Sequence, residues 1–276
     1  MKGDPRPIGV FDSGMGGLTV LRALAARLPD EHFVYLGDTA RLPYGTKSPD
    51  TVRAYALQAT HLLLSEDVKM VVIACNTASA VALEALRDAL APVPVIGVIE
   101  PGARAGVAAT RNKRIAVLAT ESTVKGAAYA QAIHQLMADA QVVQLACQVF
   151  VALAEEGWAD TRATTAAVED YLEPLFAPAD APDTLVLGCT HFPVLAAAIQ
   201  RHVGAETTLV DSAETTAGAV AEALAASALH ADTGGGPRGI RFFATDSPER
   251  FARIGAIFFG SAIEDGTVTL VDLKMA

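Results

Sequence analysis

Cysteine is scarce in this chain of 276 residues, which contains only Cys75, Cys147 and Cys189. A small and odd number of cysteines argues against the disulfide framework of small secreted domains. Their wide spacing also excludes the closely spaced cysteine pair on which most structural zinc sites are built. Catalysis, a metal site of another kind, and plain burial remain as roles for the three thiols.

Long apolar runs are also missing from the chain. No stretch approaches the roughly 20 apolar residues that a membrane-spanning helix needs. The first seven residues have no apolar segment of the kind that forms the core of a secretory signal. We therefore expect a cytoplasmic protein with no membrane partner.

Positive charge is in short supply, since 21 Lys and Arg stand against 31 Asp and Glu for a net charge of −10. The basic residues are scattered along the chain, which makes nucleic acid a poor partner. A small anion is still possible, because backbone amides at helix N-termini can bind it even in an acidic protein. With 51% hydrophobic and 19% charged residues, the chain can form a substantial core.

Short apolar runs alternate with helical patterns along nearly the whole chain, which is typical of a parallel α/β protein. The predicted strands are residues 8–11, 33–36, 71–74, 94–99, 114–119, 142–146, 185–188, 208–210, 240–244 and 267–273. The clearest predicted helices are residues 18–28, 162–176, 196–201, 212–229 and 248–259, with two more after Ser48 and after Cys75. Residues 233–237, Thr-Gly-Gly-Gly-Pro, predict a flexible linker.

Two cysteines occur in matching positions, each directly after a predicted strand. Cys75-Asn76-Thr77 follows residues 71–74, and Cys189-Thr190-His191 follows residues 185–188. In parallel sheets the carboxyl ends of the strands form the edge at which ligands bind. The repeated pattern predicts two similar parallel-sheet α/β domains, related by a pseudo-twofold axis, with the active site in the cleft between them.

Two thiols that face one ligand suggest a specific chemistry. Inversion of a stereocentre needs a base on each face of a carbon acid, so that one thiolate removes the α-proton and the opposite thiol returns one. Both cysteines precede predicted helix starts, where we expect the field of the helix to favour the thiolate. A hydrolase or acyl transferase would use a single nucleophilic cysteine and would leave the second thiol without a role.

Small polar groups beside the two cysteines complete this predicted site. The charge that develops on the substrate's carboxylate must be stabilised by hydrogen-bond donors. Suitable donors are Ser13, Asn76, Thr77 and Thr190. Asp12 and His191 also lie near strand ends, where they can assist proton movement at the two thiols.

Two other interpretations of these residues compete with this one. The glycine-rich turn of residues 12–17, with Asp38 further on, suggests a dinucleotide site, but Thr19 stands where that fingerprint needs Gly or Ala. Cys189, His191 and Cys75 are a conceivable zinc set, although it lacks the usual cysteine pair. Cys147 has apolar neighbours, and we interpret it as a structural residue.

Four motifs occur in a fixed order along the chain: Phe11–Gly17, Pro43–Gly45, Ala74–Ala78 and Leu187–Pro193. Together they resemble the glutamate racemases of the cofactor-independent aspartate/glutamate racemase family. The likeness covers nearly the whole chain and continues through residues 241–260. Four ordered motifs are a specific signal, whereas any one of them alone would be weak.

The resemblance implies two similar α/β domains, residues 1–99 with 211–276 and residues 100–210, and glutamate in the cleft between them. It implies that Cys75 exchanges a proton with D-glutamate and Cys189 with L-glutamate, and that Asp12 and His191 support them. The residues that it implies in substrate binding are Ser13, Pro43, Tyr44, Gly45, Asn76, Thr77, Thr120, Thr123, Glu155 and Thr190. It also implies a homodimer that needs no cofactor or metal and supplies D-glutamate for peptidoglycan synthesis.

Several alternatives remain at this stage. A related racemase could act on aspartate or a hydantoin, a related decarboxylase would keep only the later cysteine, and a small-anion binding protein would have no catalysis. The thiol pair disfavours a racemase that depends on pyridoxal phosphate. Residues 148–152 depart from the prolines that relatives often carry there, so the role of Glu155 is open, as is the choice between Thr120 and Thr123 as carboxylate ligand.

Overall fold

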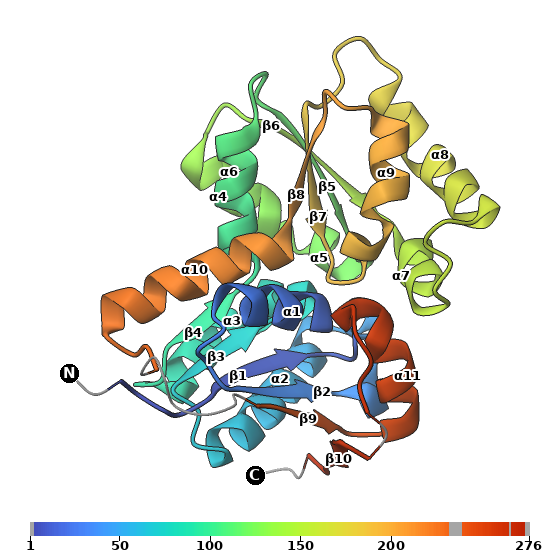
Figure 1. Cartoon of the computed structure of the whole chain (residues 1–276). Coiled ribbons are helices and arrows are strands. Elements are labelled where there is room, and N and C mark those ends of the chain that lie inside the picture. Colours follow the sequence, from blue (N-terminus) through green and yellow to red (C-terminus); the bar gives the residue numbers. More distant parts are fainter. Residues whose placement is uncertain (1–2, 232–238, 265, 274–276) are drawn as a thin grey trace.

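The computed structural model describes residues 3–231, 239–264 and 266–273, and the predicted linker at residues 233–237 lies outside them. The chain forms two lobes, each built on one sheet with helices packed against it (Figure 1). The first lobe holds a six-stranded sheet and the second lobe a four-stranded sheet. The N- and C-terminal segments both lie on the first lobe (Figure 1).

All strand pairs in both sheets are parallel. The strands of the first lobe are β1 (Ile8–Asp12), β2 (Phe33–Gly37), β3 (Met70–Ile73), β4 (Val95–Gly97), β9 (Ile240–Ala244) and β10 (Val268–Leu270). Those of the second lobe are β5 (Arg114–Ala119), β6 (Gln141–Ala146), β7 (Thr184–Gly188) and β8 (Thr208–Asp211). The prediction of two parallel-sheet α/β units is thereby confirmed.

The first four strands of each lobe follow the same spatial order within their sheet. In the first lobe the order is β10-β9-β2-β1-β3-β4, and in the second it is β6-β5-β7-β8. The four strands that open each lobe are therefore arranged as second, first, third and fourth. Parallel strands need crossover helices, which cover both faces and bury the strands, and β1, β2, β3 and β7 are buried along their whole length.

Eleven α-helices occur in the described residues. They are α1 (Leu18–Arg27), α2 (Pro49–Ser65), α3 (Asn76–Leu90), α4 (Ile99–Ala109), α5 (Glu121–Lys125), α6 (Ala128–Leu136), α7 (Gln148–Glu155), α8 (Arg162–Phe176), α9 (Ala196–Val203), α10 (Ser212–Ser227) and α11 (Pro248–Phe259). As predicted, Ser48 caps α2, since its Oγ accepts a hydrogen bond of 3.3 Å from the Thr51 amide and Pro49 follows it. Among the described helices, none has the length and apolar character to cross a membrane.

The structure corrects two sequence-based expectations and adds detail to one loop. The strand predicted at residues 94–99 ends at Gly97, and Ile99 begins α4, because a short apolar run does not distinguish a strand from a buried helix start. Helix α7 was not expected after Cys147. The loop at residues 39–47 contains two 3-10 turns, Thr39–Arg41 and Tyr44–Thr46.

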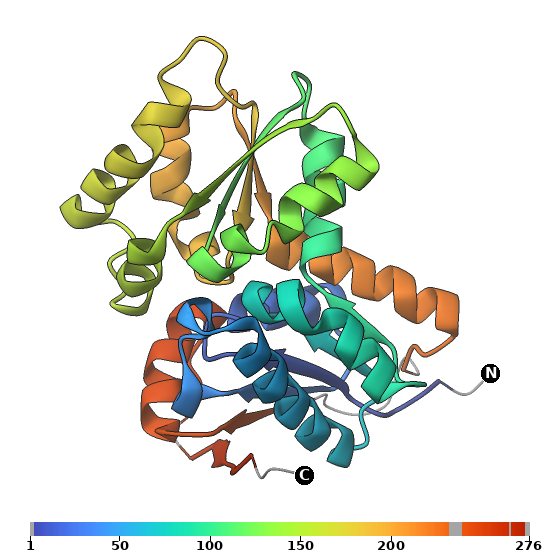
Figure 2. The ribbon, with the colours of Figure 1, turned by 180° about the vertical axis from the view of Figure 1, so that it is seen from behind.

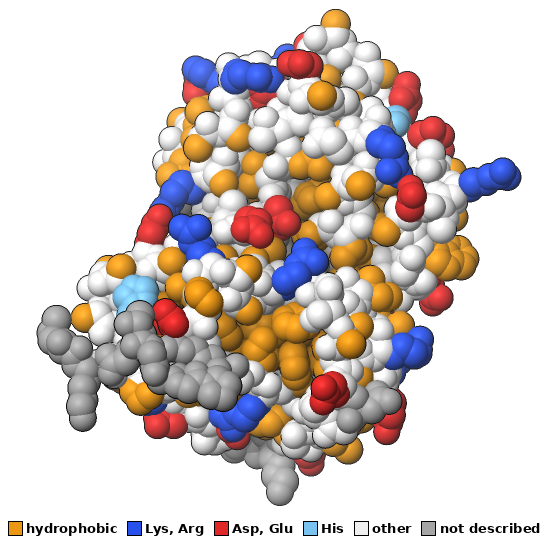
Figure 3. Space-filling model, viewed as in Figure 1, with side chains coloured by type: hydrophobic (Ala, Val, Ile, Leu, Met, Phe, Trp, Pro, Cys, Tyr) orange, Lys and Arg blue, Asp and Glu red, His pale blue; other side chains and the backbone are white. Residues whose placement is uncertain are grey.

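Helix α10 joins the two lobes after β8. It crosses from the second lobe to the first and packs against α1 and α4, as the front and back views show (Figures 1 and 2). A single apolar cluster continues through these helices from one sheet to the other. On the face seen in Figure 3, basic and acidic side chains are interspersed over both lobes.

Ala228, which follows α10, has a positive φ of 53° and is exposed. A Cβ disfavours this left-handed conformation, so Ala228→Gly should raise the free energy of unfolding by up to about 1 kcal/mol, or roughly 2–4 °C in Tm. The matched control Ala225→Gly, inside the same helix, should lower stability by about 1 kcal/mol. Thermal unfolding measures both, and two changes of the same sign would contradict this account of the helix end.

Candidate active site

The carboxyl ends of the strands in the two lobes enclose one cavity of about 310 Å³. Its walls come from the turns after β1, β3, β5 and β7, from the segment before α2, and from α7. The lining residues are Ser13, Leu42, Pro43, Tyr44, Gly45, Cys75, Asn76, Thr77, Thr120, Gln148, Val151, Ala152, Glu155, Cys189, Thr190 and His191. All predicted site residues except Asp12 and Thr123 therefore line this cavity.

A neighbouring cavity of about 390 Å³ shares Gly45 with the first one. It is lined mainly by the segment Thr46–Pro49 and by residues of α5. No thiol, histidine or amide side chain lies in its wall. We therefore place the candidate chemistry in the smaller cavity, which holds two cysteines.

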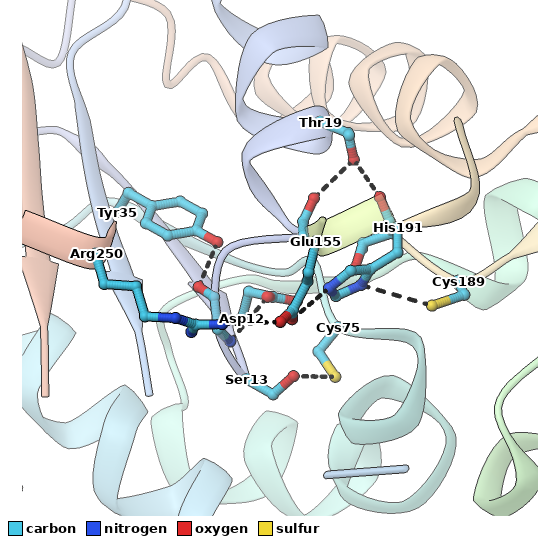
Figure 4. Close-up of polar contacts among 12 residues, drawn as sticks. Asp12, Ser13, Thr19, Tyr35, Cys75, Glu155, Cys189, His191 and Arg250 are labelled. Atoms are coloured by element: carbon cyan, nitrogen blue, oxygen red, sulfur yellow. Dashed lines mark hydrogen bonds and ion pairs between the residues drawn. The ribbon is translucent and has the colours of Figure 1, made fainter. Parts of the chain in front are cut away.

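Cys75 ends the β3 segment and is the N-cap residue of α3. Its Sγ accepts a hydrogen bond of 3.4 Å from the Ala78 amide, and its thiol donates one of 3.5 Å to Ser13 Oγ (Figure 4). Burial, together with the charge of Asp12, raises the pKa of Cys75 to about 12, although the Ala78 and Ser13 contacts act in the opposite direction. The amide at the helix start acts in the expected direction, but desolvation outweighs it, so the net shift of the Cys75 pKa is upward.

Asp12 lies behind this thiol and is completely buried. Its Oδ2 accepts a hydrogen bond of 2.9 Å from the Gly14 amide, while its Oδ1 is buried without a hydrogen-bond partner among the described residues. Burial raises the pKa of Asp12, and His191 and nearby amides oppose that rise. A carboxyl group in this state can hold or release a proton close to Cys75 without itself lining the cavity.

Cys189 opens a chain of polar contacts that runs along the cavity wall and ends at Arg250 outside it. Its Sγ lies 3.8 Å from His191 Nδ1, and His191 Nε2 lies 3.2 Å from Glu155 Oε1 (Figure 4). Arg250 Nη2 then donates a hydrogen bond of 3.2 Å to Glu155 Oε2. The order along this chain is thiol, imidazole, carboxylate and guanidinium.

The charges along this chain follow from its contacts. Burial lowers the pKa of His191, but Cys189 and Glu155 outweigh it and raise that pKa to about 10. The hydrogen bond from His191 holds the pKa of Glu155 below its ordinary value, and Arg250 adds to the effect. An imidazolium is thus placed beside Cys189, where it stabilises negative charge on a neighbouring sulfur.

The helix predicted at residues 196–201 begins at Ala196 as expected, but it does not start directly at Cys189. A 3-10 turn, Phe192–Leu195, lies between the Cys-Thr-His segment and α9. The two cysteines therefore differ in their surroundings: Cys75 caps an α-helix, while Cys189 depends on the side chain of His191.

Three threonine hydroxyl groups meet at the cavity wall. Thr77 Oγ1 lies 3.0 Å from Thr120 Oγ1, which lies 3.1 Å from Thr123 Oγ1. Thr120 faces the cavity, whereas Thr123 lies behind it and is completely buried. Of Thr120 and Thr123, the geometry therefore favours Thr120 as the residue that contacts a ligand.

Asp38 is engaged in protein contacts and does not face a ligand site. Its Oδ2 accepts a hydrogen bond of 2.5 Å from the Tyr44 hydroxyl, and its Oδ1 accepts one of 2.9 Å from Thr245. This removes the acid that the dinucleotide interpretation requires. In the described ranges, no three His, Cys, Asp or Glu side chains are grouped to hold a metal ion, so the zinc interpretation has no ligand set.

Glycines allow the two lobes to approach closely around the cavity. A Cβ added to Gly16 would lie 2.4 Å from His191 Nδ1, and one added to Gly45 would lie 2.8 Å from Thr120 Cβ. Thr19 reinforces the contact, since its hydroxyl donates a hydrogen bond of 3.0 Å to the Thr190 carbonyl (Figure 4). These positions need glycine because the opposite lobe fills the space of a side chain.

Some functional candidates were missed from the sequence. Leu42, Gln148, Val151 and Ala152 line the cavity, and Arg250 contacts Glu155 from the distant helix α11. The apolar spacing of residues 148–155 is a signal that could have revealed α7 and its cavity face. Nothing in the local sequence around Arg250 indicates its partner.

A two-lobed parallel α/β fold with a thiol from each lobe in one cavity defines a class of protein suited to proton transfer on a small acid. The sequence profile described as Asp/Glu/Hydantoin racemase matches residues 8–220. A glutamate racemase of Geobacter metallireducens is 48% identical over 260 residues, covering 94% of this chain and 95% of the relative. The chain belongs to the Asp/Glu/hydantoin racemase family and is an enzyme of the isomerase class.

Solved structures agree with this family assignment. A glutamate racemase of Bacillus anthracis has a TM-score of 0.91 at 38% identity, covering 97% of this chain and 98% of that one. A glutamate racemase of Francisella tularensis, in complex with D-glutamate, has a TM-score of 0.89 at 34% identity and covers 98% of both chains. The predicted resemblance is thereby confirmed.

The close contact at Gly16 predicts the effect of a minimal substitution. Gly16→Ala would push His191 and Thr190 away, and a displacement near 1 Å in such a site lowers racemase activity by about 100-fold. Gly218→Ala in α10 is the matched control: it meets no atom within 4 Å, should leave activity unchanged and should add about 1 kcal/mol of stability. Steady-state kinetics and thermal unfolding of both variants test this, and full activity of Gly16→Ala would contradict it.

The raised pKa of His191 predicts a pH dependence of stability. The folded protein holds this proton more tightly than the unfolded chain does, so the contribution is complete below pH 6.5, the ordinary pKa, and is lost as the pH rises through about 10. The stability difference between the wild type and His191→Gln should therefore shrink over this interval. Urea unfolding of both proteins at pH 6.5 and at about pH 10 measures this difference in stability. A difference that stays constant would argue against a charged His191.

Proposed function

We propose that this enzyme interconverts L- and D-glutamate by proton transfer at the α-carbon between Cys75 and Cys189. The observation that carries the proposal is that both thiols line one cavity, each with a different proton-handling partner. Support for glutamate comes from relatives named as glutamate racemases at about half sequence identity over nearly the whole chain. The Francisella tularensis relative, which was solved with D-glutamate, adds to that support.

In the L-to-D direction, Cys189 acts as a thiolate beside the His191 imidazolium. The Cα–H bond of L-glutamate breaks and its proton goes to Cys189 Sγ, while the electron pair stays on the α-carbon and spreads into the carboxylate. The S–H bond of Cys75 then breaks and its proton bonds to the opposite face of Cα, which gives D-glutamate. Exchange of protons with solvent restores a thiol at Cys75 and a thiolate at Cys189.

The surroundings of the thiols fit these starting states. The pKa of Cys75 is raised to about 12, so this residue begins as a proton donor. In the D-to-L direction Cys75 must lose its proton, and Asp12 and Ser13 are placed to take part in that transfer. Asn76, Thr77 and Thr190 stand beside the thiols as hydrogen-bond partners of the substrate's charged groups.

The distal carboxylate of glutamate has a separate set of donors in this proposal. Thr120, Tyr44 and the backbone at Gly45 lie in the wall of the same cavity, and Thr123 supports Thr120 from behind. Glu155 acts through His191 by fixing the imidazolium next to Cys189. All the chemistry in this scheme comes from side chains of the protein, without a cofactor.

The proposal extends to the predicted biology and organisation. It comprises supply of D-glutamate for peptidoglycan synthesis in the cytoplasm, a homodimer, and domains at residues 1–99 with 211–276 and 100–210. The biological part rests on the family resemblance. The domain division is supported by the assignment of β1–β4, β9 and β10 to one sheet and β5–β8 to the other.

Isotope incorporation provides a direct test of the two-base scheme. In D₂O without added cofactor, L-glutamate should give D-glutamate with one deuterium at Cα, while the remaining L-glutamate keeps its proton at low conversion. The reason is that each thiol carries a single proton and serves one face of the substrate. Proton NMR with chiral analysis measures both pools, and absence of racemisation or of Cα deuterium would refute the proposal.

Variants of the two cysteines test which face of the substrate's α-carbon each thiol serves. Cys75→Ser and Cys189→Ser should each lower interconversion by about 1,000-fold, since a positioned proton-transfer group contributes about 10²–10⁴-fold. Cys75→Ser should still exchange the Cα proton of L-glutamate with solvent, and Cys189→Ser that of D-glutamate. Cys147→Ser is the matched control, because Cys147 is buried but does not line the cavity, and it should retain activity. An unaffected Cys189→Ser enzyme would exclude the two-thiol mechanism.

A further inference from the structure

A hydrogen bond between the lobes meets the cavity at Asn76. This residue follows Cys75 directly, begins α3 in the first lobe, and is 3% exposed. Its Nδ2 donates a hydrogen bond of 2.8 Å to the hydroxyl of Tyr129, which belongs to α6 in the second lobe. Its Oδ1 is buried and has no hydrogen-bond partner within the described part of the chain.

Tyr129 is held firmly where its hydroxyl meets Asn76. The side chain is completely buried, and its ring lies against two glycines of the second lobe. A Cβ added to Gly188 would lie 2.9 Å from the ring, and one added to Gly102 would lie 3.2 Å from the hydroxyl. Because the ring fills this slot, the hydroxyl has a fixed position relative to β7, the strand that carries Cys189.

The contact holds the Asn76 carboxamide in place beside the cavity. A tyrosine hydroxyl can donate or accept, and here it accepts from the amide nitrogen. The amide oxygen is left as a buried acceptor without a partner among the described residues. A buried acceptor of this kind is unfavourable unless a ligand supplies a donor, and the donor that glutamate carries is its α-ammonium group.

We propose that Tyr129 is a positioning residue, whose hydroxyl holds Asn76 through Nδ2 so that Oδ1 is left to accept a hydrogen bond from the α-ammonium group of the substrate. Tyr129 does not touch the substrate and acts only through Asn76. Since the two residues belong to different lobes, Asn76 is held in this way only where the lobes are in contact. This inference rests on the proposed function, because it concerns how the same substrate is held.

The variant Tyr129→Phe removes the hydroxyl and keeps the ring in its slot. Loss of this contact weakens binding of ground state and transition state alike, so KM should rise about tenfold while kcat changes less than about threefold. The loss of kcat/KM should be equal for both enantiomers, because they have the same free energy in water. Tyr171→Phe, a similar change on α8 away from the cavity, is the control and should leave KM unchanged.

A double-mutant cycle separates positioning from a general structural effect. In an Asn76→Ala background the hydroxyl has nothing to hold, so adding Tyr129→Phe should change KM by less than about twofold. Additive increases in KM would show that Tyr129 acts independently of Asn76 and would overturn the inference. Thermal unfolding of each variant accompanies the cycle, since a purely structural role would lower Tm without raising KM.

The outcomes also distinguish this inference from the proposed function. A wild-type enzyme that racemises glutamate, with an unchanged KM in Tyr129→Phe, would overturn the inference alone. A wild-type enzyme that does not racemise glutamate would overturn the proposed function and the inference with it. A raised KM in Tyr129→Phe that disappears in the Asn76→Ala background supports both.

Discussion

The close approach of two sheet edges is the constraint on which the candidate site depends. At Gly16 the backbone of the first lobe lies so near His191 and Thr190 that a single Cβ would collide with them, and Gly45 meets Thr120 in the same way. This contact removes both thiols from solvent, with each cysteine only 5% exposed. Desolvation then determines the proton chemistry: it raises the pKa of Cys75 and strengthens every charge interaction nearby, because water no longer screens them.

The same closure makes the two sides of the cavity electrically unequal. Cys75 is buried with the acid Asp12 behind it, and both raise its pKa, while the Ser13 hydroxyl beside it acts in the opposite direction without outweighing them. Cys189 has a cation beside it, and that cation is kept charged by Glu155, whose own charge is supported by Arg250. The two cysteines therefore have different proton-handling partners within one cavity.

Much of this arrangement could be predicted from the sequence, because it follows from local rules. Buried parallel strands appear as β-branched runs, and a cysteine directly after such a run must lie at the ligand-binding edge. What could not be predicted depends on contacts between distant residues. Arg250 and Tyr129 reach the site from α11 and α6, and no local pattern indicates their partners.

The net pKa of Cys75 could not be predicted for the same reason. The position of a residue at a helix start can be inferred from sequence, and the structure confirms that Cys75 is an N-cap residue. Its degree of burial depends on how closely the second lobe approaches, which is a property of the assembled chain. The local inference gave the right direction for the helix contribution, but burial outweighs that contribution and sets the net pKa.

Thermodynamics limits what the unequal sides of the cavity can achieve in the proposed reaction. The two enantiomers of glutamate have the same free energy in water, so kcat/KM must be equal in the two directions, whatever surrounds each thiol. The asymmetry can only change how that ratio is divided between kcat and KM for each enantiomer. The Asp12 side and the His191 side therefore need not be equally effective. They need only provide, between them, one thiol and one thiolate on opposite faces of the same carbon.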